Sequence, residues 1–175
     1  MRAAAAVSAV VAGVATVASV AIAQPAASTA PCNAAEHRQF DFWLGRWEVF
    51  TADGKKAGDN VIEAIDGGCA LIERWRGGGG FSGTSLNSWD GAAKQWRQHW
   101  IDSQGGLLRL AGRLDGQRMV LEGAEPHPDK PGITRAQRIA WTPLPDGAVR
   151  QLWEQSDDQG VSWTVVFDGR YVRAK

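Results

Sequence analysis

The sequence predicts an all-β domain, an antiparallel up-and-down β-barrel of eight to ten strands with a short helical plug near its N-terminus. From residue 40 onward, short runs rich in Val, Ile, Leu, Trp and Thr alternate with Gly, Asp, Asn and Pro clusters, which is typical of an antiparallel meander. No second large element is predicted that could cover a face of the sheet. Closure is therefore the arrangement that removes both edges and buries one face. A two-sheet sandwich is the alternative that the same alternation permits.

The first element in order is a secretory signal over residues 1–23. Arg2 supplies a positive start, an uncharged Ala- and Val-rich run follows, and Ala21-Ile22-Ala23 gives the small-x-small pattern that signal peptidase reads. A transmembrane anchor is the alternative, but the run is weakly hydrophobic and no Lys or Arg cluster follows it. We expect cleavage after Ala23 and a periplasmic or secreted location.

Residues 24–35 are expected to form a flexible lead-in because they are rich in Ala, Ser and Thr and offer little bulk to bury. Residues 36–175 are then a single domain with one core. The two cysteines, Cys32 and Cys69, would meet an oxidising compartment after export, so a disulfide is the simplest outcome. Two free or buried thiols remain the alternative, since only distance decides pairing.

The plug is the only segment with a helical pattern. Within residues 36–44, Phe40, Trp43 and Leu44 fall at i, i+3 and i+4. The strands that follow are separated by turns rich in Asp-Gly, a pair that supplies the positive φ of tight hairpins. The predicted strands cover residues 46–52, 58–66, 69–77, 83–89, 95–102, 106–113, 117–124, 133–142, 147–156 and 161–173.

Composition excludes several classes of partner and cofactor. The 19 basic residues balance 19 acidic ones, so no electrostatic signal points to nucleic acid or an anionic membrane. His37, His99 and His127 have no metal-binding spacing, and we predict neither a metal site nor a cofactor. The run Gly78–Gly83 matches G-x-G-x-x-G, but a strand rather than a helix is predicted after it, so it is interpreted as a glycine-rich hairpin or loop.

The segment DFWLGRWEVF at 41–50 places the plug ahead of Gly45-Arg46-Trp47, a Gly-x-Trp motif that resembles the signature of the lipocalin superfamily and its calycin barrel. With GGCALIERW, SLNSWD, LWEQSDDQGVSW and FDGRYVR, nearly all of residues 40–173 resembles an exported bacterial group of lipocalin-like barrels known only as a domain of unknown function. The resemblance implies a container fold in which Arg170 or Arg173 stacks over Trp47 in a structural role. Similar nitrobindin-like barrels hold haem through a histidine near the C-terminal end, but this chain has no histidine after His127.

Nine tryptophans are the strongest compositional signal. Solid core packing could explain them, but a cavity lined by indoles with Arg and Gln would suit a small hydrophobic or aromatic ligand that could carry an acidic group. We predict that Trp100, Trp153, Gln98, Gln151 and Arg97 line this cavity. The leading hypothesis is an exported binding protein, a monomer or weak dimer, with no catalytic residues assigned.

Two other classes of function stay open. A barrel-type lyase or isomerase would require at least two of Glu73, Arg97, His99 and Glu154 to converge inside the cavity within hydrogen-bond reach. An interaction module for a protein or glycan would instead show an outward apolar patch of tryptophans and no cavity. The direction of these side chains separates the three hypotheses.

Overall fold

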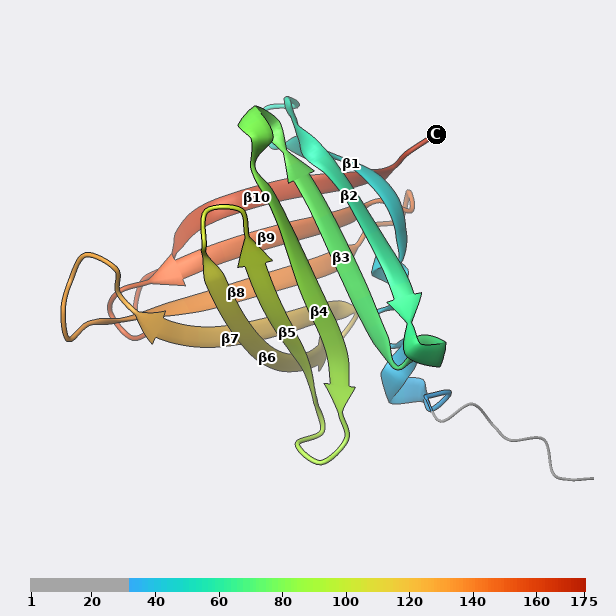
Figure 1. The fold of residues 1–175 in the computed structure, drawn as a ribbon, viewed down its shortest axis with the longest axis horizontal. Helices are drawn as coiled ribbons and strands as arrows, with labels where there is room; N and C mark the ends of the chain where they lie inside the picture. The colour runs from blue at the N-terminus through green and yellow to red at the C-terminus, as the bar shows by residue number, and fades with distance from the viewer. Residues whose placement is uncertain (1–31) are drawn as a thin grey trace, which may run out of the picture.

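The computed structural model describes residues 32–175, which form a closed barrel of ten antiparallel strands (Figure 1). Each strand pairs with its neighbours along the chain, and β1 pairs with β10 from Trp47 opposite Arg173 to Thr51 opposite Gly169, which closes the ring. The predicted fold class, an all-β up-and-down barrel, is confirmed. The predicted signal peptide and residues 24–31 of the predicted lead-in lie outside the described residues.

The strands follow one another with short connections. They are β1 Gly45–Thr51, β2 Lys56–Ile65, β3 Ala70–Gly77, β4 Ser82–Asp90, β5 Gln95–Asp102, β6 Leu107–Asp115, β7 Arg118–Pro126, β8 Thr134–Pro143, β9 Val149–Ser156 and β10 Thr164–Arg173. Two of the Asp-Gly turns behave as their sequence predicts, with φ of 81° at Gly54 and 60° at Gly116. Within residues 32–175, no helix combines the length and hydropathy needed to cross a bilayer.

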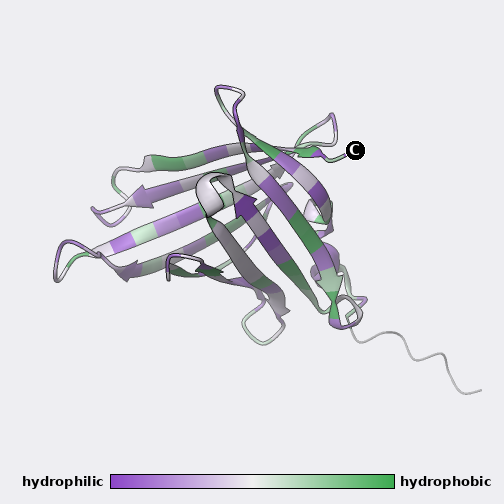
Figure 2. Cartoon of the chain, turned by 45° about the horizontal axis from the view of Figure 1, so that its top comes forward, coloured by the Kyte–Doolittle hydropathy of each residue, from purple (hydrophilic) through white to green (hydrophobic). Residues whose placement is uncertain are grey.

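The two ends of the barrel differ. Odd-numbered strands run toward the end that carries the connections at 52–55, 78–81, 103–106, 127–133 and 157–163, which we call the open end. The opposite, closed end carries the N-terminal turns, drawn in blue at the lower right of Figure 1. Hydrophilic and hydrophobic residues alternate along the strands, as Figure 2 shows, because successive side chains of a strand point to opposite faces of the sheet.

An aromatic cluster fills the closed end. The predicted helical plug consists of two short 3-10 turns, Ala35–Arg38 and Asp41–Trp43, because Phe40 between them leaves helical geometry at φ −106° and ψ 7°. Phe40 stacks on Trp43 at 4.9 Å between ring centroids and meets the edges of Trp96 at 5.6 Å and Trp141 at 5.2 Å. All four side chains are fully buried or within 1% of it. This cluster closes one end of the barrel to water.

A disulfide fixes the plug to the barrel. Cys32 is joined to Cys69, which directly follows the β2–β3 turn, with the two Cα atoms 5.0 Å apart. Arg38, on the first 3-10 turn, also donates a hydrogen bond to the backbone carbonyl of Gly68. Cys32 belongs to the predicted flexible lead-in, residues 24–35, yet it is only 8% exposed and is covalently held. The disulfide therefore holds this end of the described chain against the barrel.

Trp47 is covered by an arginine of the last strand. The guanidinium carbon of Arg173 lies 3.9 Å from the ring centroid of Trp47, and Arg173 also donates to the backbone carbonyl of Leu44 at 2.5 Å. Arg170, the other candidate, points outward and pairs with Asp146. Because Arg170 and Arg173 are an odd number of residues apart, only one of them can share the face of Trp47.

Candidate functional site

A cavity of about 340 Å³ occupies the open half of the barrel. Aromatic side chains form the cavity wall nearer the open end, and polar side chains form its floor, toward the closed end. The aromatic residues of the lining are Trp75, Trp100, Trp153, Phe81 and Phe167. The floor is formed by Glu73, Gln98, Gln151 and Tyr171.

Three strands contribute to the cavity by the same local pattern. On β3, β5 and β9 an inward polar residue is followed two positions later by an inward tryptophan, giving the pairs Glu73 and Trp75, Gln98 and Trp100, and Gln151 and Trp153. All three strands run from the closed end to the open end, so the polar group lies deeper in each pair. Period-two alternation thus produces both the polar floor and the aromatic walls.

Glycines on neighbouring strands keep this space open. A Cβ atom on Gly83 would lie 2.1 Å from the indole of Trp100, and one on Gly58 would lie 2.8 Å from the indole of Trp75. Each indole therefore lies over the backbone of a neighbouring strand, at a glycine that has no side chain. A bulky aromatic ring against a cross-strand glycine packs along the wall of the barrel instead of filling its centre.

A buried hydrogen-bond network surrounds the Glu73 carboxyl group. Glu73 is 4% exposed and accepts hydrogen bonds from Asn60 Nδ2 at 2.7 Å and Ser85 Oγ at 2.6 Å. Ser85 Oγ accepts in turn from Asn87 Nδ2 at 2.8 Å, and Gln98 Nε2 donates to Asn87 Oδ1 at 2.9 Å. Burial raises the pKa of Glu73 above its usual value, although the bonds from Ser85 and Asn60 act in the opposite direction.

Tyr171 completes the floor. Its hydroxyl group donates to Gln151 Oε1 and lies 3.4 Å from Asn60 Nδ2. Burial, and secondarily the negative charge of Glu73, raise the pKa of Tyr171 well above its usual value, so the phenol remains neutral at physiological pH. The indole N–H of Trp153 is also satisfied, since it donates to Gln137 Oε1 at 2.8 Å.

Four of the five predicted lining residues, Trp100, Trp153, Gln98 and Gln151, border the cavity. The prediction that Arg97 joins them is wrong. Arg97 neighbours Gln98 and therefore faces the opposite side of β5, where it is exposed and its Nε lies 2.7 Å from Asp90 Oδ2. The same alternation that placed Gln98 and Trp100 together excludes Arg97 from the interior.

The alternative hypotheses make geometric predictions that the structure contradicts. Of the four residues required to converge for lyase or isomerase chemistry, Glu73 alone lines the cavity, while His99 is exposed on the outer face of β5. Glu154 lies on the outer face of β9 and forms an ion pair with Arg138 at 2.9 Å. The interaction module required outward tryptophans and no cavity, yet all nine tryptophans are buried or half-buried.

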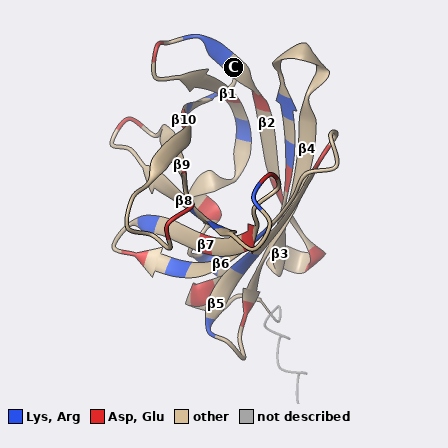
Figure 3. Ribbon diagram, turned by 90° about the vertical axis from the view of Figure 1, so that its left-hand side faces the viewer, with Lys and Arg blue, Asp and Glu red and all other residues tan. Residues whose placement is uncertain are grey.

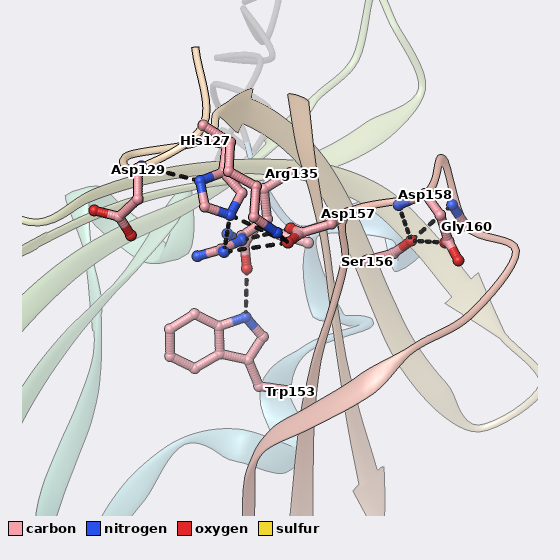
Figure 4. A network of polar contacts seen from close by, with 10 residues as sticks. His127, Asp129, Arg135, Trp153, Ser156, Asp157, Asp158 and Gly160 are labelled. Carbon is pink, nitrogen blue, oxygen red and sulfur yellow. Dashed lines mark hydrogen bonds and ion pairs between the residues drawn. The ribbon is translucent and has the colours of Figure 1, made fainter. Parts of the chain in front are cut away.

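A charged network fastens two long loops at the open end (Figure 4). His127, in the β7–β8 connection, is buried, with its side chain only 2% exposed. Its Nδ1 accepts from the backbone N–H of Asp129 at 3.0 Å, and its Nε2 lies 3.1 Å from Asp157 Oδ2. Arg135 and Lys130 also bond Asp157 and hold the pKa of that carboxyl group well below its usual value. The network links the β7–β8 and β9–β10 connections.

The charged residues are distributed around the barrel, as Figure 3 shows from the side of the open-end loops. The cavity lining differs from this mixed surface, because its ionisable residues Glu73, Asp102 and Tyr171 include no Lys, Arg or His. Within residues 32–175, no group of three His, Cys, Asp or Glu side chains is placed to hold a metal ion.

Several lining residues were missed at the sequence level. Trp75 could have been found, because Glu73-Arg74-Trp75 repeats the polar-x-Trp pattern of Gln98 and Gln151. Phe81 and Phe167 gave no such signal, since one lies in a glycine-rich connection and the other follows a register shift on β10. Neither position follows from regular alternation.

No protein-family model matches the sequence, and no curated protein matches it.

Proposed function

We propose that this chain is an exported binding protein that holds a small hydrophobic or aromatic molecule in the open half of its barrel. The observation that carries the proposal is the cavity of about 340 Å³, closed below by the aromatic cluster and lined above by indole and phenyl rings. Ligand pockets in proteins have volumes of about 300–1,000 Å³ and combine apolar walls with a few fixed polar groups. This cavity belongs to the small end of that range and suits a molecule of one or two rings.

The walls offer a preorganised apolar surface. Trp100 and Trp75 are held across glycines, and Trp153 is fixed by its hydrogen bond to Gln137, so these rings keep their positions without a ligand. Removing apolar surface from water contributes roughly 25 cal/mol per Å², and rigid walls reduce the entropy lost on binding. Both effects favour a flat apolar ligand.

The lining does not support the acidic ligand considered from the sequence. That expectation depended on Arg97, which lies outside the barrel. Among the described residues, those that line the cavity include Glu73 and Asp102 but no basic residue, so a carboxylate ligand would enter an environment of like charge. A ligand without negative charge fits the site better.

Export is supported by the disulfide between Cys32 and Cys69, because such bonds persist in oxidising compartments such as the periplasm or the cell exterior. It also agrees with the signal-like composition of residues 1–23. The resemblance of the Gly-x-Trp motif to lipocalin-like barrels points the same way, because that superfamily is built around containers for small molecules.

A pair of matched substitutions tests the proposal. Ala57 lines the cavity near the open end of β2, whereas Ala64 is exposed on the same strand. Isothermal titration calorimetry and tryptophan fluorescence would be used with neutral ring compounds, 2-phenylethanol and indole. We expect wild type and Ala64→Phe to bind and Ala57→Phe, whose added ring fills the cavity, to lose binding. Absence of binding to wild type, or equal binding by both variants, would contradict the proposal.

A further inference from the structure

We propose that the ligand of this cavity is an organic cation, a ring compound carrying an amine, whose charged nitrogen contacts Glu73 while its apolar part lies against the tryptophans. The inference rests on the proposed function and adds the charge of the ligand to it. It depends on three features of the lining: the sign of its ionisable groups, the balance of donors and acceptors on its floor, and the ring faces above them.

The floor has more hydrogen-bond acceptors than donors left for a ligand. Each oxygen of Glu73 accepts one hydrogen bond, from Asn60 or Ser85, whereas an ionised carboxylate can accept about four in total. Gln98 uses Nε2 to donate to Asn87, and no described residue donates to its Oε1. The floor also has one free donor group, Gln151 Nε2, for which no described residue provides an acceptor. An ammonium group, with up to three donors and no acceptor, complements this set.

The walls suit a cation for an independent reason. The face of an indole ring carries negative electrostatic potential and attracts ammonium groups within about 6 Å of the ring centroid, more strongly than phenyl rings do. Trp75, Trp100 and Trp153 all border the cavity. The N–H of Trp100 is directed to Asp102 Oδ2 at 3.4 Å, and that of Trp153 to Gln137. Because both N–H groups already have acceptors, these two indoles offer a ligand only the faces of their rings.

Among residues 32–175, no cationic side chain is paired with Glu73. Its side chain is bonded by an amide and a hydroxyl group, and the other ionisable groups facing the cavity are Tyr171 and Asp102, neither of which can be positive. A buried carboxylate without a cationic partner is expensive to ionise. A ligand ammonium group would supply the missing partner, which gives a cation an advantage that a neutral molecule of the same shape does not have.

The test compares three compounds that share one ring and differ in charge: 2-phenylethylamine, 2-phenylethanol and 3-phenylpropionate. Calorimetric titration of the wild-type domain should rank the amine about tenfold or more tighter than the alcohol, a difference expected for one added charge-assisted contact, with the carboxylate weakest. Because the ranking is measured on wild type, it does not depend on whether any variant folds.

Glu73→Gln removes the charge while keeping the size of the side chain. We expect this variant to lose the preference for the amine and to bind the alcohol as wild type does. The control is Glu63→Gln on the outer face of β2, which removes an exposed carboxylate and should leave the ranking unchanged.

The outcomes separate the two proposals. If none of the three compounds binds wild type, the proposed function is overturned. If the alcohol binds and the amine binds no more tightly, or if Glu73→Gln retains the full preference for the amine, only the inference of a cationic ligand is overturned. The pH dependence gives a further check, because amine affinity should rise with pH as Glu73 ionises, while the affinity for the alcohol stays constant.

Discussion

Truncation of Phe40 to alanine tests whether the aromatic cluster is what closes and stabilises the barrel. Phe40 is completely buried and contacts Trp43, Trp96 and Trp141 at centroid distances of 4.9 to 5.6 Å. Phe→Ala substitutions in protein cores cost about 3–5 kcal/mol, because apolar contacts are lost and a cavity remains. We expect about 4 kcal/mol here, since three rigid indoles cannot collapse into the space.

The loss should be visible as a lower melting temperature. For about 140 ordered residues with an unfolding entropy of roughly 2 cal/mol/K each, 4 kcal/mol corresponds to a decrease of about 13 °C. Differential scanning calorimetry and urea unfolding would measure it. Val161→Ala, at a position 86% exposed, is the control and should change stability by less than about 0.5 kcal/mol. A Phe40→Ala variant that unfolds within 1 kcal/mol of wild type would refute the role of this cluster.

Three other predictions concern the disulfide, the open-end loops and the cavity wall. Replacing Cys32 and Cys69 by serine opens a loop of 37 residues and should destabilise the domain by about 3–4 kcal/mol in urea unfolding; an unchanged midpoint would contradict this. Loop hydroxyl groups and a backbone N–H lower the pKa of Asp158 to about 2, so its contribution is present above pH 3.8 and lost as pH falls toward 2. Acid unfolding followed by circular dichroism should therefore be less steep over this range in Asp158→Asn, and identical curves would argue against it. Gly83→Ala should push Trp100 into the cavity and weaken calorimetric binding of 2-phenylethanol by roughly fivefold, an effect on the order of 1 kcal/mol, whereas unaltered affinity would show that the indole has room to move.

Most of the fold could be predicted because the runs of alternating hydrophobic residues and the turn-forming residues between them mark the same strand boundaries along the chain. Asp53-Gly54 and Asp115-Gly116 mark hairpins at the residues where the chain turns, and the ten predicted strands correspond to β1–β10 with small differences at their ends. The helical pattern at Phe40 and Trp43 correctly located the plug. It could not show that the segment breaks into two 3-10 turns, since packing of Phe40 into the barrel overrides local helical preference.

The site could be predicted only in part. Alternation along a strand shows which side chains face the interior, but not how deep in the barrel they lie or which residues of other strands they contact. Gln98 and Trp100 were assigned to the interior by spacing within one strand. The partners of Glu73, by contrast, lie on other strands: Asn60 on β2 and Ser85 on β4 meet it only through the strand register. Arg97 directly precedes Gln98 and therefore lies on the other face of β5, so an interior position for this arginine conflicts with the period of the strand.

The charged network around His127 was also hidden from sequence reasoning. Its prolines and charges are typical of an exposed loop, and Asp157 lies 30 residues away on a different connection. Sequence separation of this size carries no signal of contact unless the pairing of strands is already known.

The central claim is that the open half of the barrel is a binding space and not a packed core. The most direct test is a crystal structure of residues 24–175 soaked with 2-(4-bromophenyl)ethanol, with the bromine located by anomalous scattering. We predict a bromine site inside the barrel, between Trp100 and Trp153 and above Glu73. Bromine found only on the outer surface, with the indoles occupying the interior, would contradict the account.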